Sequence, residues 1–338
     1  MPVDTNIVAL ESNRSLEISA LVEQAQDYAR HAKADNTRRA YHADWNDFDA
    51  WCGTHRFATL PASPETVALY LSHLANTHKC STLQRRISAI SQVHAAKGLE
   101  SPTKTALVRA VWQGIRRAKG VAPECKEPAV TPIIRRMVAQ LPDNLLGTRD
   151  RALLLVGFAG GFRRSELVGL NRSDVVFTVE GATITLRRSK TDQEGEGRKI
   201  GIPYGSYGYT CPVRSLQAWL NATKPPTPES DPLQAPLYNV KETPLFAGVN
   251  RHGHVSPKRL SGNAVASVVK RYAEKAGLDA TKFAGHSLRA GLATAAAKAG
   301  VSERAIMAQT GHKSVQMVRR YIRDGELFQE NAAAEVGL

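Results

Sequence analysis

The chain from residue 163 onward carries four short clusters of side chains that could act on phosphate groups. They are Arg163, Arg164 and Glu166; Lys190; His286 and Arg289; and His312 and Tyr321. Arginine forks bind phosphate oxygens, histidine and lysine transfer protons, and a tyrosine hydroxyl can be a nucleophile. Each cluster alone has an ordinary explanation, because most arginines are solvated surface charges and most single histidines and tyrosines are structural. Their combination is therefore more informative than any one of them.

The composition predicts a two-domain protein with a polyanionic partner. Single hydrophobic cores stop growing near ~250–300 residues, so a chain of 338 residues indicates two domains. The chain has 45 basic and 31 acidic residues and a net charge of +14, which favours DNA or RNA as the partner. A basic protein without such a partner is the alternative.

The same sequence indicates neither membrane insertion nor secretion. No apolar run reaches the ~18 residues of a membrane span, and the N-terminal MPVDTNIVALESNRSLE has acids where a signal peptide needs basic residues. The four cysteines, Cys52, Cys80, Cys125 and Cys211, form no CxxC pair and are predicted to be reduced thiols. We therefore expect a cytoplasmic protein.

Periodicity divides the chain into a flexible tail at residues 1–15, a helical domain at 16–120, a linker at 121–131 and a second domain at 132–338. The helical domain contains an aromatic stripe on one helical face, typical of core packing, at Tyr41, Trp45, Phe48 and Trp51. Short loops separate its helical segments, which predicts a bundle of four or five helices. The linker is proline-rich and aperiodic.

The second domain should be helical with a small antiparallel sheet. Its β-rich runs lie at residues 175–180, 182–188 and 198–204, and Glu180-Gly181 predicts a tight turn between the first two. Helical patterns are expected later, at residues 256–276, 285–299, 302–310, 314–322 and 324–338. The predicted fold class is therefore mainly α with a small antiparallel β-sheet.

The order and spacing of the four clusters resemble the tyrosine recombinase (phage integrase) family, in particular its Cre and Xer branches. GFRRSEL at Gly161–Leu167 is similar to the family box Gly-x-Arg-x-Ser-Glu-Leu, His286 and Arg289 to its His-x-x-Arg box, and Gly311-His312 to its Gly-His box. The resemblance covers most of the chain. It implies a helical core-binding domain and a mixed α+β catalytic domain with a three-stranded sheet, which form a C-shaped clamp on DNA.

The resemblance also implies how the strand is cleaved. Tyr321 would attack the phosphate and store the break as a 3′-phosphotyrosine, which can be resealed without ATP. Its pKa near ~10 requires a proton acceptor, for which His286 is the candidate. Lys190 would protonate the departing 5′-hydroxyl.

The remaining residues of the boxes would hold the phosphate. Arg163 and Arg289 would neutralise its two non-bridging oxygens, and both interactions strengthen as charge builds in the transition state. His312 would hydrogen-bond the same phosphate, and Glu166 would hold Arg163 in place. Arg164 falls outside the catalytic positions of the box and would face DNA or solvent.

Contacts outside the active site are expected with DNA and with other protomers. In members of the family, helices of the core-binding domain cross the major groove of the duplex. The corresponding helices of this chain carry Arg38, Arg39, Arg85, Arg86 and His94. A solvated helix face is the alternative there. The C-terminal helix, with Leu327 and Phe328, would dock on a neighbouring protomer. The resemblance implies a homotetramer, built as two dimers on double-stranded DNA with inverted repeats. Packing within its own chain is the alternative for that helix.

Three functions remain open from the sequence. The first is a site-specific recombinase that exchanges strands between two sites, the second a type IB topoisomerase-like enzyme that relaxes DNA, and the third a non-catalytic DNA-binding protein on the same fold. None of them requires a cofactor. No metal is expected, because His252 and His254 lie in a loop without a nearby third ligand.

Overall fold

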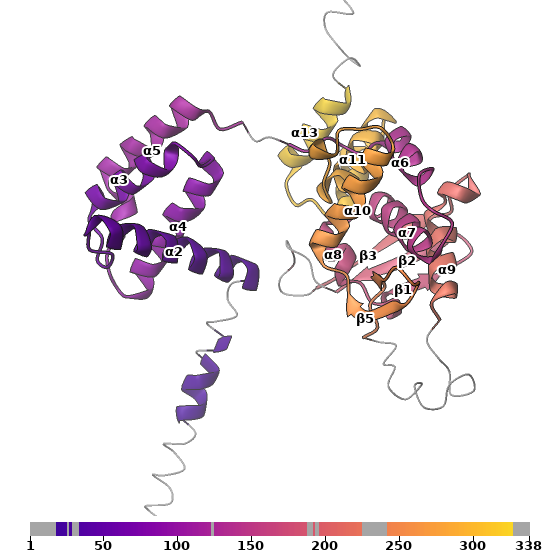
Figure 1. Ribbon diagram of the computed structural model, residues 1–338, viewed down its shortest axis with the longest axis horizontal. Coiled ribbons are helices and arrows are strands. Elements are labelled where there is room, and N and C mark those ends of the chain that lie inside the picture. The colour runs from indigo at the N-terminus through magenta and orange to yellow at the C-terminus, as the bar shows by residue number, and fades with distance from the viewer. Residues whose placement is uncertain are drawn as a thin grey trace, which may run out of the picture. The chain divides into compact units, whose positions relative to one another are not determined.

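The computed structural model describes residues 18–25, 27–28, 34–122, 125–187, 192, 196–224 and 242–326. The chain separates into two compact units, Met1–Glu124 and Cys125–Leu338. Figure 1 shows that both are built mainly from helices, and two small antiparallel sheets lie in the second unit. The predicted fold class is confirmed.

Within residues 34–122, the first unit contains four long helices around an aromatic core. They are α2 (Asp35–His55), α3 (Pro64–Ala75), α4 (Cys80–Ala96) and α5 (Ala106–Lys119). Phe48 and Tyr70 are fully buried with rings 4.9 Å apart, and Trp45 and Trp51 pack against the same cluster. Three residues of the predicted aromatic stripe, Trp45, Phe48 and Trp51, therefore lie on a core face, whereas the half-buried Tyr41 is not a member of this cluster. Ser63 accepts a hydrogen bond from the amide of Thr66, so the Ser-Pro start of α3 acts as an N-cap.

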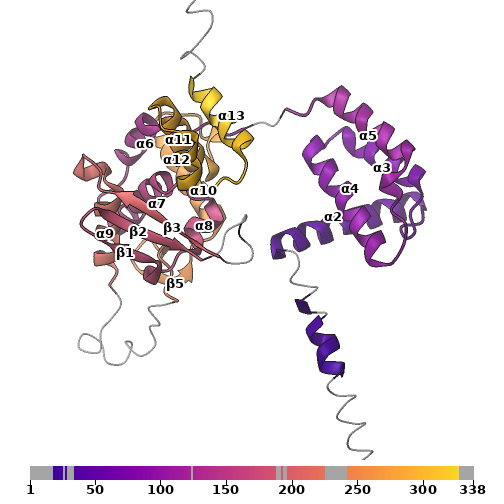
Figure 2. The same cartoon turned by 180° about the vertical axis from the view of Figure 1, so that it is seen from behind.

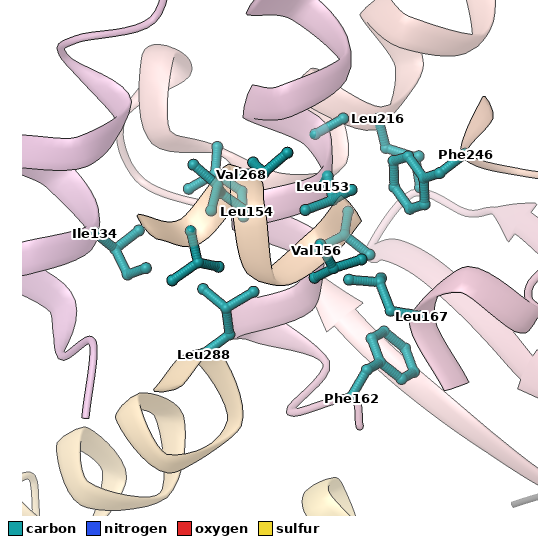
Figure 3. Packing of buried hydrophobic residues seen from close by; sticks show 14 of the residues in the cluster. Ile134, Leu153, Leu154, Val156, Phe162, Leu167, Leu216, Phe246, Val268 and Leu288 are labelled. Atoms are coloured by element: carbon teal, nitrogen blue, oxygen red, sulfur yellow. The ribbon is translucent and has the colours of Figure 1, made fainter. Parts of the chain in front are cut away.

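In the second unit, α7 (Leu145–Ala159) is the central helix. The other helices are α6 (Thr131–Val138), α8 (Arg164–Gly169), α9 (Pro212–Ala222), α10 (Gly262–Lys275), α11 (His286–Lys298), α12 (Glu303–Thr310) and α13 (Val315–Glu326). Figure 3 shows Leu154 of α7 near Val268 of α10 and Leu288 of α11, all in one buried cluster. Because α7 is buried on several sides, the turn that follows it is held in a fixed place.

The three predicted strands form one sheet in the order β1-β2-β3, all antiparallel. They are β1 (Val175–Phe177), β2 (Gly181–Leu186) and β3 (Arg198–Pro203). Ile184 pairs with Ile200, and both are buried. The turn before β2 requires Gly181, since a Cβ there would lie 2.1 Å from the carbonyl oxygen of Ile202.

Two expectations for the C-terminal part were wrong in their bounds. The helix expected from residue 256 begins only at Gly262, where Ser261 caps it, and the preceding residues form β5 (Val255–Arg259), paired with β4 (Ala247–Val249). Pro257 is tolerated there because β5 is an edge strand. Residues 324–326 belong to α13, and the rest of the predicted last helix, with Leu327 and Phe328, lies outside the described residues. None of the described helices is long and apolar enough to cross a membrane.

Candidate active site

The turn after α7 delivers Arg163 to the start of α8. Gly161 has φ 57°, and a Cβ there would lie 3.0 Å from side-chain atoms of Leu292 and Thr310, so the turn is both left-handed and tight. Nη1 of Arg163 donates to Oε1 of Glu166 at 2.5 Å, and the Arg163 amide donates to Oε2 at 2.8 Å. Glu166 is buried. One carboxylate thus fixes both the backbone and the guanidinium of Arg163.

Arg289 lies on α11 and is only 1% exposed. Its Nη1 donates to the carbonyl oxygens of Gly161, at 2.8 Å, and of Thr310. Burial and the positive charge of Arg163 lower the pKa of Arg289 to about 10, so it stays charged at neutral pH. Its Nη2 is buried and has no hydrogen-bond partner among the described residues. A buried guanidinium with an unsatisfied donor is suited to bind an anion, which accepts the hydrogen bond.

His312 lies in the turn that ends α12 and is 5% exposed. Oγ1 of Thr310 donates to the Ile306 carbonyl at 2.6 Å and lies 2.7 Å from Nδ1 of His312, so Nδ1 is the donor in that bond. Nε2 is buried and has no partner within the described part of the chain. Burial, followed by the charges of Arg289 and Arg163, lowers the pKa of His312 to about 3.

Tyr321 reaches the same place from α13. Its hydroxyl lies 2.9 Å from Nε2 of His286, the first residue of α11, and its ring centroid lies 5.7 Å from that of His312. Val318 anchors α13 in a small buried cluster with α11 and α12, which lie beside it in Figure 2. The tyrosine therefore completes the site of its own chain.

His286 is suited to accept a proton from Tyr321. His286 is exposed as a whole residue, but the protein around its ring and the charges of Arg289 and Arg163 lower its pKa. A neutral imidazole at hydrogen-bond distance from a phenol can serve as its general base.

Arg198 belongs to this site although the motifs did not indicate it. It is the first residue of β3, and its guanidinium donates to the carbonyl oxygens of Ala308, Gln309 and Thr310 at 3.0–3.3 Å. Arg198, Ile200 and Ile202 share one face of β3, and both isoleucines are buried. A charged residue on the inward face of a strand was the available signal.

The assembled site is strongly positive. Arg163, Arg198 and Arg289 are close enough for each charge to disfavour the others, while Glu166 is the acid that favours them. Among the described residues, three guanidinium charges face one carboxylate, and this surplus of positive charge favours the binding of an anion.

The last predicted catalytic residue and the second arginine of the box stand apart from this description. Lys190 lies outside the described residues. Arg164 is exposed and turned away, with its stem over Gly262 and Gly285 and its Nη1 donating to Oδ1 of Asn263 at 3.4 Å. The adjacent arginines therefore differ in environment, as the box implied.

The predicted DNA contacts on α4 need correction. His94 is fully buried, and its ring accepts from the Ala62 amide at 3.0 Å and bonds the Ile90 carbonyl at 2.9 Å. Arg86 is also buried, paired with Asp47. Both side chains are held inside the unit by its own polar groups, so neither is available to a duplex.

The other three predicted contacts remain on the surface. Arg38 and Arg39 are exposed at the start of α2. The side chain of Arg85 is 48% exposed and forms two hydrogen bonds with Asp44, at 2.6 and 2.9 Å.

The described residues contain no group of three histidine, cysteine, aspartate or glutamate side chains placed to hold a metal ion. The His252 and His254 rings lie 6.4 Å apart in the exposed turn between β4 and β5.

Comparison with known proteins agrees with this geometry. The Phage integrase family matches residues 133–326, more than half of the chain. An integrase/recombinase xerD homolog of Selenomonas ruminantium is 40% identical over 337 residues, which cover 98% of this chain and 94% of that protein. The Cre recombinase of Escherichia phage P1 is 25% identical over 344 residues, 96% of this chain and 92% of that protein.

Solved structures show the same fold. The XerH site-specific recombinase bound to a palindromic difH substrate matches with a TM-score of 0.57 and 19% identity, over 80% of this chain and 72% of that one. The Tn1549 transposon integrase in complex with transposon right end DNA matches with a TM-score of 0.60 and 14% identity, over 93% and 98% of the two chains. The chain thus belongs to the phage integrase family of site-specific tyrosine recombinases, which cleave and rejoin DNA.

Proposed function

We propose that this chain cleaves double-stranded DNA through a 3′-phosphotyrosine on Tyr321 and exchanges strands between two sites as a tetramer. The observation that carries the proposal is the 2.9 Å contact between the Tyr321 hydroxyl and Nε2 of His286, beside a buried arginine and histidine with unsatisfied nitrogen atoms. The first feature supplies a nucleophile with its base, and the second supplies a place for a phosphate.

The chemical step follows from these contacts. The Tyr321 oxygen attacks phosphorus, its proton passes to Nε2 of His286, and the bond between phosphorus and the 5′-oxygen breaks. Lys190, assigned by sequence, donates the proton that the 5′-oxygen needs. The phosphotyrosine keeps the energy of the broken bond, so the reverse attack by a 5′-hydroxyl reseals the strand without ATP.

Phosphate binding would use the unsatisfied groups. Nη2 of Arg289 and the guanidinium of Arg163 would each donate to a non-bridging oxygen. Nε2 of neutral His312 carries no proton, because Nδ1 donates to Thr310. His312 would therefore take up a proton when phosphate enters, and an adjacent anion favours that charged form.

The first unit and the assembly complete the proposal. We infer that residues 16–120 hold the duplex, with Arg38 and Arg39 on its phosphates, and that two dimers join inverted-repeat sites. Relatives support this, since XerH was crystallised on difH and a lambda integrase dimer on a COC′ core site. The reaction would take place in the cytoplasm, in line with the bacterial origin of the 40% identical relative.

The test begins with DNA selected from a random-sequence pool by the full-length protein. A version of that duplex nicked beside the cleavage position loses a short fragment after attack and traps the covalent complex. Wild-type protein should accumulate a protein–DNA adduct that denaturant does not remove. Absence of an adduct would leave a non-catalytic DNA-binding protein.

A second assay separates recombination from relaxation. Two labelled duplexes carrying the selected site should yield recombinant products in which their flanks are exchanged. Relaxation of supercoiled DNA without exchange would instead indicate a topoisomerase.

A further inference from the structure

Three arginines from distant parts of the second unit meet at the C-terminal end of α12. Arg163 donates to the carbonyl of Gly311 at 3.3 Å, Arg289 to that of Thr310, and Arg198 to Thr310 and the two carbonyls before it. The last carbonyls of a helix have no partner within the helix and carry partial negative charge. Arg198 satisfies them from the neighbouring strand.

Arg198 and Gly311 fit each other closely. Gly311 has φ 66°, and a Cβ at that position would lie 2.7 Å from Cζ of Arg198. The guanidinium thus occupies the space that any other residue at position 311 would need. The turn that presents His312 is shaped around Arg198.

We infer that Arg198 is a positioning residue of the active site: it clamps the end of α12, so that the Thr310 carbonyl and the His312 ring are held toward Arg289. The inference rests on the proposed function only in assuming that the site cleaves DNA, because the contacts of Arg198 are observed independently of that function. Arg198 donates inward to backbone carbonyls, so it acts through the turn and not by touching the phosphate.

The clamp links the phosphate-binding groups around Thr310 with the strand end that follows Lys190. The carbonyl of Thr310 accepts from Arg198 and Arg289, and its hydroxyl accepts from His312. Movement of Thr310 would therefore displace both the Arg289 guanidinium and the His312 ring. Arg198 also begins the strand that follows Lys190 in the sequence, which ties that strand end to α12.

The experiment compares Arg198→Gln, Arg198→Lys and the control Lys199→Gln in the full-length chain. Lys199 lies on the same strand with an exposed side chain. Adduct formation is measured in single turnover on the selected nicked duplex, at saturating DNA, together with the Kd. A misplacement of about 1 Å costs about 100-fold in rate, so we expect such a loss in both Arg198 variants, an unchanged Kd, and no change in Lys199→Gln.

The lysine variant separates position from charge. It keeps one positive charge but lacks the planar fork that reaches three carbonyls. A wild-type rate in Arg198→Lys would overturn the inference, because charge alone would then suffice. Arg198→Lys is also the more conservative change, and it decides the question if Arg198→Gln does not fold.

A second readout needs no DNA. Arg289 and His286 of α11, Arg163 before α8, Tyr321 of α13 and Arg198 all face His312. ¹⁵N NMR of histidine-labelled protein, with the signal assigned through His312→Gln, should show a higher His312 pKa in Arg198→Lys, because this variant keeps the opposing charge while loss of the clamp reduces the burial that chiefly lowers that pKa. An unchanged pKa would overturn the inference. If wild-type protein forms no adduct but the His312 pKa rises, the proposed function is wrong and the positioning role stands.

Discussion

The Tyr321 hydroxyl and Nε2 of His286 lie 2.9 Å apart, although α13 and α11 are separated in the chain by α12. A contact of this length places the proposed nucleophile and its proposed proton acceptor in position before any substrate arrives. Attack then requires only that phosphate enter the space between them and the arginines.

The first prediction concerns the nucleophile. Tyr321→Phe removes the attacking oxygen but keeps the ring that lies near His312. The variant should bind the selected duplex with wild-type affinity and form no covalent adduct. Gel electrophoresis under denaturing conditions measures the adduct. Cleavage by this variant would place the nucleophile elsewhere.

The second prediction concerns the pH dependence of cleavage. The pKa of His286 lies below 6.5, and its neutral form is the one that accepts a proton. The adduct rate should therefore hold steady as pH falls from neutral and decline only below pH 6.5. In His286→Gln the rate should be lower throughout and this decline should be absent. A decline centred above pH 6.5 in wild-type protein would contradict the role of His286.

The third prediction contrasts the adjacent arginines. Arg163→Ala and Arg289→Ala should each lower the adduct rate by about 100- to 1,000-fold, or more, since each removes a donor to the developing charge. Arg164→Ala should lose much less, because its guanidinium is turned toward Asn263 and away from the site. Single-turnover rates give the comparison. Equal losses at Arg163 and Arg164 would show that the two faces were assigned wrongly.

The fourth prediction concerns stability at acid pH. The pKa of His312 is about 3 in the folded protein, against an ordinary value of 6.5. Between these values the unfolded chain binds a proton that the folded chain lacks, so stability is lost as pH falls, by at most about 1.4 kcal/mol per pH unit from this group. Urea unfolding of wild type and His312→Gln at several pH values measures the difference. Parallel pH slopes for the two proteins would show that His312 titrates normally.

The fifth prediction separates burial from DNA contact in the first unit. His94→Ala should lower the free energy of unfolding by about 1–3 kcal/mol, because it leaves the buried Ala62 amide without its acceptor. Its DNA affinity should keep the wild-type salt dependence. Arg39→Ala should leave stability unchanged and reduce the slope of log K against log salt by about 1. A His94→Ala variant with unchanged stability and a reduced salt slope would instead show that His94 contacts DNA.

Most candidate site residues were predicted from the resemblance to the family boxes, which are short local patterns in the sequence. Arg163 and Glu166 are three residues apart at a helix start, and this spacing alone brings them into contact. The turn at Gly181 and the strands on both sides of it were also local features. Such features depend on neighbours in the chain, so they could be predicted without knowledge of the fold.

The errors came from contacts between distant segments. Arg198 was missed because its partners are backbone carbonyls more than a hundred residues away, which leave no side-chain motif. His94 was misplaced although it lies four residues after Ile90, on the stripe that faces the core. Its burial is stable only because the Ala62 amide satisfies the ring. The pairing of β4 with β5 was likewise missed, because Pro257 in β5 argues against a strand when the sequence is read alone.

The anchoring of α13 separates the activity of the enzyme from its stability. Val318 and the few alanines around it form a cluster distinct from the main core, and Arg319 adds a surface ion pair with Glu303. Among the described side chains, those of α13 pack in that small cluster and not in the main core, so we expect the local opening free energy of α13 to lie well below that of global unfolding. Backbone amides of α13 should exchange with solvent long before those of α7. If the exchange rates follow this expectation, the proposed nucleophile lies on an element that can leave its place while the rest of the phosphate pocket stays folded.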